Sequence, residues 1–158
     1  MRQAAQLIEA FRGRGSVDGF DTASSFGHAP SLLIADDDAA VVGLLSHHFA
    51  RLGFEVDTAS DGLQAFLKAT RGKPSVLVID VNMPELDGLS VCGHLLDADR
   101  APAKVIIITS SSNQHTLQRC ERVGTRHVRK GPDFWRDLDA ALLEIDPRMA
   151  RRLRRTTC

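Results

Sequence analysis

The sequence has few cysteines and no long hydrophobic run. Cys92, Cys120 and Cys158 form no C-x-x-C pair, so reduced thiols are favoured over a disulfide framework. No stretch approaches the roughly 18 consecutive apolar residues of a membrane-spanning helix, and the N-terminus lacks the apolar core of a signal peptide. These absences argue against a membrane protein and predict a cytoplasmic location.

An excess of charge is also missing. Lys and Arg number 20 and Asp and Glu number 20, which gives a formal net charge of zero. No overall field would draw the chain to membrane or nucleic acid, and we do not expect a nucleic-acid partner. The one asymmetry is a basic tail that contains Arg148, Arg151, Arg152, Arg154 and Arg155. We expect this tail to form a solvated terminal helix, or one that supports a homodimer, beginning at Asp146 and Pro147. Contact of its basic face with DNA or with an acidic partner is the alternative.

The length of 158 residues suits one α/β domain with short extensions. Residues 1–29 are interpreted as an N-terminal extension, with a short amphipathic helix over residues 1–12 and a linker rich in Gly, Ser and Asp. The domain itself is assigned to residues 30–145, and the basic tail to residues 146–158. No internal repeat is visible.

Short apolar runs alternate with helical patterns from Ser31 onward. The runs predict strands at residues 31–36, 54–59, 75–80, 104–109 and 126–130. The periodic segments predict helices at residues 38–51, 61–71, 86–97, 113–123 and 133–145. Most runs are continuously apolar, as in strands buried on both faces, whereas FEVDTA alternates as an edge strand does. This order predicts a parallel sheet with helices on both faces.

Two of the helical segments carry further expectations. In the first helix, one face should collect Val41, Leu44, Leu45, Phe49 and Leu52. His47 and His48 on the same helix are interpreted as surface or packing residues, because no partner ligand lies at metal spacing. At the start of the last helix, one of Phe134 and Trp135 should pack inward, and the other is a candidate partner contact.

Polar groups follow four of the predicted strands, at the edge where ligands bind in sheets of this kind. They are Asp36–Asp38, Asp80, Thr109 and Lys130. Clustered carboxylates stay ionised only with a cation among them, and oxygen ligands at a partly solvated rim suit Mg²⁺. A lysine and a hydroxyl beside the metal supply what a phosphoryl group needs. The pattern predicts attack by a carboxylate on phosphorus, giving an aspartyl phosphate.

The segments LLIADDD, VLVIDVNMPELDGL, VIIITSSS and RKGPDF resemble the response regulator receiver family of two-component signalling. The resemblance covers residues 31–145, and its most specific part is the D-x-N-M-P-x-x-D-G block from Asp80 to Gly88. It implies a flavodoxin-like (βα)5 fold, with a five-stranded parallel sheet in the order 2-1-3-4-5.

The resemblance also implies site roles. Asp80 is expected to accept the phosphoryl group and to bind Mg²⁺. Asp37 would bind the metal directly, Asp36 would bind it through water, and Asn82 would offer its backbone carbonyl. Lys130 would pair with the phosphoryl oxygens, and the Thr109 hydroxyl would meet one of them. Asp38 is interpreted as the start of a helix, because acids are favoured in a first helical turn.

The fifth strand matches the family least well. The family has an aromatic switch residue, usually Tyr or Phe, three positions before its lysine, and this chain has neither at that position. An alignment that keeps Lys130 puts His127 at the aromatic position, whereas a gapless alignment puts Val128 there and loses the lysine. We prefer the first, because the phosphoryl charge needs a cation. His127 would then respond to movement of the Thr109 hydroxyl; an exposed histidine without a role is the alternative.

The function implied is a single-domain response regulator that is phosphorylated by a sensor histidine kinase and is not a turnover enzyme. Phosphorylation would change binding to a downstream protein at the family's output surface, formed here by residues 113–123, 126–130 and 133–145. One alternative is a phosphotransfer intermediate or phosphate sink that exchanges with a histidine phosphotransfer protein; another is a scaffold without phosphoryl chemistry. Ser110 is small and should leave the phosphoryl group accessible to water. We therefore expect the aspartyl phosphate to have a lifetime on the order of minutes.

Overall fold

The structure is a computed structural model that describes residues 29–100, 102, 104–123 and 125–156. The helix expected over residues 1–12, nearly all of the 1–29 extension, and Cys158 lie outside the described residues. Within them, Cys92 and Cys120 are free and buried, and burial raises the pKa of Cys92 to about 12. No described helix has the length and apolar character needed to cross a membrane.

The described elements begin and end within two residues of the predicted ranges. The strands are β1 (Ser31–Ala35), β2 (Glu55–Ala59), β3 (Val76–Asp80), β4 (Val105–Thr109) and β5 (Arg126–Arg129). The helices are α2 (Ala39–Arg51), α3 (Gly62–Gly72), α4 (Gly88–Asp97), α5 (Gln114–Val123), α6 (Phe134–Ile145), the 3-10 turn η1 (Pro147–Met149) and α7 (Ala150–Thr156).

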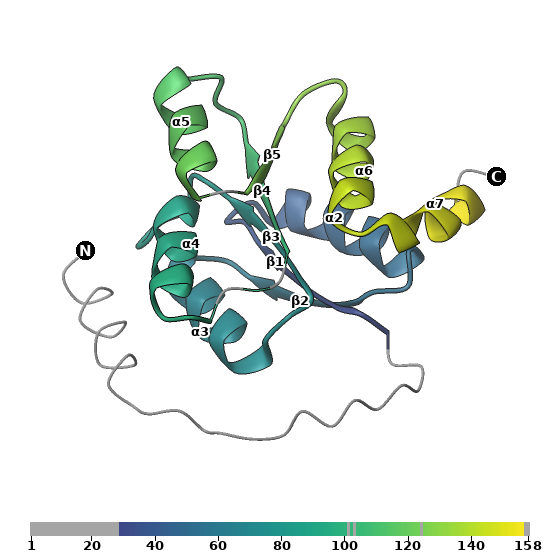
Figure 1. Cartoon of the computed structure of the whole chain (residues 1–158), viewed down its shortest axis with the longest axis horizontal. Helices are drawn as coiled ribbons and strands as arrows, with labels where there is room; N and C mark the ends of the chain where they lie inside the picture. Colours follow the sequence, from purple (N-terminus) through teal and green to yellow (C-terminus); the bar gives the residue numbers. More distant parts are fainter. Residues whose placement is uncertain (1–28, 101, 103, 124, 157–158) are drawn as a thin grey trace.

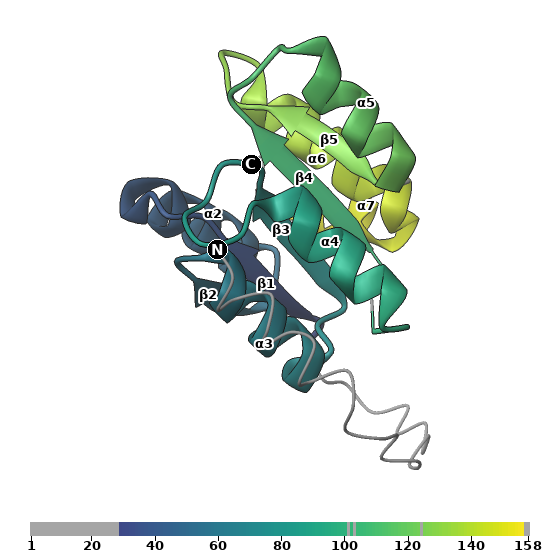
Figure 2. The same ribbon diagram turned by 90° about the vertical axis from the view of Figure 1, so that its left-hand side faces the viewer.

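All five strands are parallel, in the order β2-β1-β3-β4-β5. This confirms the flavodoxin-like order that the family resemblance implied. The helices form two layers: α3, α4 and α5 cover one face of the sheet, and α2 and α6 cover the other (Figures 1 and 2). The register pairs Ala35 with Ile79 and Asp80 with Ile108, so β1, β3 and β4 end at the same edge.

A separate hydrophobic core lies on each face of the sheet. Leu33, Ala35, Leu77 and Ile79 point into the core beneath α3, α4 and α5. Leu32, Ile34, Val76 and Val78 point into the core beneath α2 and α6. Because side chains alternate along a strand, burial on both sides requires continuous apolar runs. β2, at the edge, alternates between exposed and partly buried positions, as its sequence predicts.

The predicted buried face of α2 was wrong at one position. Leu45 and Phe49 are fully buried, and Val41 and Val42 pack against the same core. Leu44, expected among them, is 61% exposed. Successive helical residues are about 100° apart, so a stripe centred on Leu45 turns Leu44 away from the sheet. The periodicity of the sequence predicted the helix correctly, but it placed Leu44 on the wrong side of the helix relative to the sheet.

His48 packs between α2 and α6. Its Nε2 lies 2.8 Å from Asp139 Oδ1 on α6, and its ring lies 4.9 Å, centre to centre, from that of Trp135. His47 is exposed. Phe134 packs against the core, whereas Trp135 is 38% exposed. The packing interpretation of the histidines therefore agrees with the contacts in the described residues.

The tail is attached to the domain more firmly than expected. Asp146 caps η1 by accepting a hydrogen bond from the backbone N–H of Arg148. Met149 is 4% exposed and belongs to the core beneath α2 and α6, where Leu153 also packs. Met149 and Leu153, the apolar residues among the arginines of the tail, hold α7 against the domain. The tail is therefore solvated on only one side.

Candidate functional site

Asp36 and Asp37 lie directly after β1, where the chain leaves the sheet. The Asp36 backbone N–H still donates to the Ala59 carbonyl of β2, 3.1 Å away, so the sheet fixes this residue. Its side chain is buried, at 1% exposure, whereas Asp37 is exposed. Asp38 N-caps α2 through hydrogen bonds from the backbone of Ala40 and Val41. The helix thus begins immediately after the two acids and holds them at the rim.

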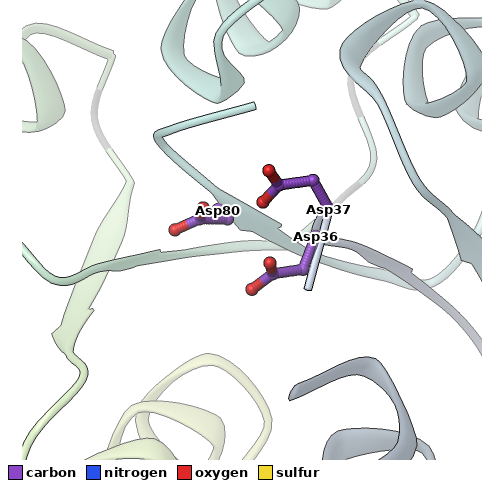
Figure 3. Close-up of side chains that lie close together, drawn as sticks. All are labelled: Asp36, Asp37 and Asp80. Atoms are coloured by element: carbon purple, nitrogen blue, oxygen red, sulfur yellow. The ribbon is translucent and has the colours of Figure 1, made fainter. Parts of the chain in front are cut away.

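Asp80 ends β3 and lies beside the Asp36–Asp37 pair. One oxygen atom from each of the three carboxylates can be chosen so that all lie within 4.8 Å of one another. Figure 3 shows the three side chains gathered at one place, two from the end of β1 and one from β3. Such crowding of negative charge requires a compensating cation.

Lys130 supplies one positive charge. Its Nζ donates to Asp36 Oδ2 at 2.7 Å and lies 3.3 Å from Asp80 Oδ1. Burial opposes the ammonium form, but the two carboxylates outweigh it, and the pKa of Lys130 is raised. A lysine beside Asp36 and Asp80 is what the alignment that keeps Lys130 requires. One ammonium against three carboxylates still leaves the rim negative.

The pKa of Asp80 is raised to about 6. Burial in the sheet is the main cause, and the charges of Asp36 and Asp37 add to it, while Lys130 acts in the opposite direction. Asp80 Oδ1 is buried and accepts no hydrogen bond; the Lys130 contact is an ion pair without hydrogen-bond geometry. A buried carboxylate oxygen without a donor is costly, and a cation at the rim would remove that cost.

The donor set fits Mg²⁺. All the side-chain ligands at the rim are carboxylate oxygens, which magnesium prefers, and the exposed Asp37 leaves room for water in its coordination shell. Asn82, which the resemblance implies as a backbone ligand, follows Val81 in the loop after β3 and its side chain is exposed.

Thr109 and Lys130 are linked through the backbone. Thr109 ends β4, is fully buried, and its Oγ1 accepts a hydrogen bond of 3.0 Å from Ser111 N–H. The Lys130 backbone N–H donates to the Thr109 carbonyl at 2.8 Å. This hydrogen bond ties the start of the loop after β5 to the end of β4. His127, the candidate switch residue, lies on β5 opposite Ile107, and its side chain is exposed.

The loop after Asp80 is folded back tightly over the strand. Gly88 N–H donates to the Val81 carbonyl at 3.0 Å, and a Cβ at Gly88 would collide with the backbone oxygen of Asp80. Only glycine fits this approach. Geometry thus explains the glycine of the motif, because the close approach of Gly88 to β3 fixes the loop that carries Asn82.

Sequence reasoning gave no role to Asp87, and the structure gives it two. Its carboxylate caps α4 by accepting from the N–H groups of Leu89 and Ser90. It also accepts from Arg119 of α5 at 3.2 Å. The cap could have been predicted from the pattern D-x-x-S, since such residues start helices. The arginine could not, because it is 32 residues away in the chain.

Curated relatives of this chain include proteins named as response regulators and as transcriptional regulatory proteins. Response regulator MprA of Mycobacterium leprae is 36% identical over 126 residues, which make up 79% of this chain and 51% of MprA. The alkaline phosphatase synthesis transcriptional regulatory protein PhoP of Bacillus subtilis is 45% identical over 64 residues, 40% of this chain and 27% of PhoP. The chain thus spans about half or less of the length of these relatives.

A solved structure supports the same assignment. The CheX–CheY–BeF3–Mg²⁺ complex of Borrelia burgdorferi matches with a TM-score of 0.66 and 26% identity, over 73% of this chain and 88% of that chain. Residues 32–131 match the response regulator receiver domain, and they include the acidic rim, Thr109 and Lys130. The chain therefore belongs to the response regulator receiver family.

Proposed function

We propose that Asp80 accepts a phosphoryl group from a phosphohistidine, with Mg²⁺ bound by Asp36, Asp37 and Asp80. The carrying observation is the meeting of three carboxylates and the Lys130 ammonium at one rim of the sheet. Bound there, Mg²⁺ would neutralise the carboxylates and the incoming phosphoryl charge. The presence of BeF3 and Mg²⁺ in the Borrelia complex supports this assignment.

In the proposed step, a carboxylate oxygen of Asp80 attacks phosphorus and the phosphorus–nitrogen bond of the donor breaks. The imidazole leaves with the bond electrons, and an aspartyl phosphate remains. Asp80 must be ionised to attack; its pKa of about 6 keeps most of it ionised at neutral pH. Lys130 is within reach of Asp80 and offsets charge on the phosphoryl oxygens.

The output proposed is a change in binding to a downstream protein. Thr109 and Lys130 share a backbone hydrogen bond, and α6 begins four residues after Lys130. A hydroxyl drawn toward the phosphoryl group would therefore displace the end of β4 and, through Lys130, the end of β5. The face made of α5, β5 and α6 is where we expect this movement to be read.

The test is phosphorylation by acetyl phosphate with Mg²⁺, measured by intact-mass spectrometry on wild type and Asp80→Asn. We expect one phosphoryl group on wild type, none on the variant, and loss of the reaction in EDTA. An unmodified wild type under these conditions would favour the scaffold alternative. The half-life of the product, expected to be minutes, is read from the same samples after removal of acetyl phosphate.

A phosphotransfer intermediate is the second candidate. Incubation with a phosphorylated histidine phosphotransfer protein separates the two: fast exchange in both directions favours the relay, and one-way transfer favours the terminal switch. The stand-alone organisation, the cytoplasmic location, the lack of turnover activity and a homodimer stay predictions, as do the roles of Asn82 and His127.

A further inference from the structure

We propose that α7 binds the phosphate backbone of duplex nucleic acid, without sequence preference, through Arg151, Arg154 and Arg155. We name these three residues the arginine face. The zero net charge of the chain argues against an overall attraction to nucleic acid, but the structure concentrates positive charge locally. This inference is independent of the proposed phosphoryl chemistry.

The helix that carries the arginine face is fixed to the domain. Arg152 donates from Nη1 to the carbonyls of Leu52 and Gly53, at 3.0 and 3.1 Å, just after α2. On the same side of the tail, Met149 is buried and Leu153 packs against the core. These contacts set the rotation of α7 about its axis, which leaves the opposite side to solvent.

The three arginines lie on that opposite side. They occupy positions i, i+3 and i+4, which are neighbours on a helix, about 5–6 Å apart at Cβ. Each is exposed. Among the described residues none of the three has an acidic partner, in contrast to Arg148, whose guanidinium is taken up by Asp146. Their positive charges therefore remain available to an external anion.

The residues around the arginine face indicate which kind of anionic partner it can bind. The strongest contacts of protein interfaces combine arginine with aromatic residues in a desolvated centre. The exposed large apolar residues of the described chain are Leu44, Leu96 and Trp135, and none of them is on α7. A helix that inserts into a membrane needs a free apolar side, whereas Met149 and Leu153 are turned into the core.

Phosphate groups remain as the ligand, and the arrangement of the three arginines favours the phosphates of a duplex. Single strands are held through stacking on aromatic side chains, and η1 and α7 have none. Duplexes present closely spaced phosphates that arginine binds through paired N–H donors. A face made only of arginine, on a fixed helix, matches such an array.

The arginine face lies far from the acidic rim. Leu52 and Gly53 precede β2, so α7 lies at the amino ends of the parallel strands, beside the end of α2 (Figure 1). Asp36 and Asp80 lie at the carboxyl ends of β1 and β3. Duplex binding should therefore be the same with and without beryllofluoride and Mg²⁺, and the same in Asp80→Asn.

The experiment is fluorescence anisotropy of a labelled 20-base-pair duplex, titrated with the full chain at several salt concentrations. Three phosphate contacts predict a slope of log K against log[salt] of about −2.7, equivalent to a loss of about fortyfold in affinity between 50 and 200 mM salt. Arg154→Gln should reduce the slope by about 0.9, and Arg151→Gln/Arg154→Gln/Arg155→Gln should abolish binding.

Arg122→Gln is the matched control. Arg122 is an exposed arginine on α5, on the other face of the sheet, and its replacement should leave the slope unchanged. Circular dichroism of each variant checks folding, and the single variant keeps the test valid if the triple variant unfolds. Three results would overturn the proposal: no duplex binding by wild type at 20 mM salt, an equal loss in Arg122→Gln, or binding of acidic peptides or anionic vesicles in place of the duplex.

Discussion

The Lys130 ammonium joins the ends of three strands: it lies 2.7 Å from Asp36 Oδ2 and 3.3 Å from Asp80 Oδ1, 94 residues along the chain from Asp36. The same residue is hydrogen-bonded through its backbone to Thr109. Lys130 thus has two connections: its side chain compensates the charge of Asp36 and Asp80, and its backbone is bonded to the end of β4, whose movement it would transmit.

Replacement of Lys130 should impair both chemistry and folding. In Lys130→Met, Asp36 and Asp80 lose their cation, so we expect phosphorylation by acetyl phosphate to fall at least tenfold and stability at pH 7.5 without metal to fall by about 1–2 kcal/mol. Lys68→Met is the control, since Lys68 forms an exposed pair with Asp57. Equal phosphorylation of Lys130→Met and wild type would remove Lys130 from the site.

Asp80→Asn should stabilise the protein in EDTA at alkaline pH. The folded pKa of Asp80, about 6, lies above its ordinary 3.8. The folded state therefore binds this proton more tightly than the unfolded state, and that stabilisation is lost as the pH rises from 4 to 6. Asparagine carries no charge, so we expect the variant to exceed wild type by about 1–2 kcal/mol at pH 8, after allowance for solvent screening.

Thermal unfolding at pH 8 and pH 4 measures this effect. The gain in Tm should amount to several degrees at pH 8 and should disappear at pH 4, where Asp80 is protonated in the folded protein. Glu121→Gln, at an exposed position of α5, should change Tm little at either pH. A variant less stable than wild type at pH 8 would contradict the repulsion inferred for the rim.

Asp146→Asn should have the opposite pH dependence. Hydrogen bonds from Arg148, and further from Lys104, hold the pKa of Asp146 far below its usual range, against the effect of burial. A lowered pKa contributes stability above the unfolded value of 3.8, and this is lost as the pH falls below it. We expect a loss of about 1–2 kcal/mol at pH 7, since the partners are partly solvated.

Urea unfolding at pH 7 and pH 3 would measure that loss, which should be smaller at pH 3. Asp57→Asn is the comparison, because its pair with Lys68 is exposed and should contribute little. A loss that is equal at both pH values would mean that Asp146 acts through packing and not through charge.

Gly88→Ala should damage the site without removing any of its ligands. The added Cβ would collide with the Asp80 backbone oxygen, so the loop must shift away from β3. We expect a loss of about 2 kcal/mol or more in stability and weaker Mg²⁺ binding, measured by isothermal titration. Gly93→Ala on α4 is the control, because a Cβ there meets nothing within 4 Å. Equal metal affinity in Gly88→Ala and wild type would show that the loop does not position the site.

The parts of this protein that follow from local pattern could be read from the sequence. The buried runs of β1 and β3 are apolar because both faces of the sheet are covered, so the polar residues at their ends, Asp36 and Asp80, stand out. Parallel strands end at one edge, which places these residues together. Asp38 as a helix cap is likewise a local property.

Rotation and long-range contact needed the tertiary structure. Leu44 is as apolar as Leu45, and only the docking of α2 on the sheet decides that Leu45 is buried and Leu44 exposed. The contact of Arg152 with the end of α2 joins residues 100 positions apart. In the sequence the tail is a cluster of charge; in the fold it has an inward and an outward side.

The sequence by itself determined the succession of strands and helices along the chain and the acids at the strand ends, because burial on two faces leaves a local signature in each segment. The tertiary structure decided which distant side chains meet those acids, which face of each helix is covered, and where the arginines of the tail point. Those outcomes depend on how separate elements pack against one another, and no single segment carries that information.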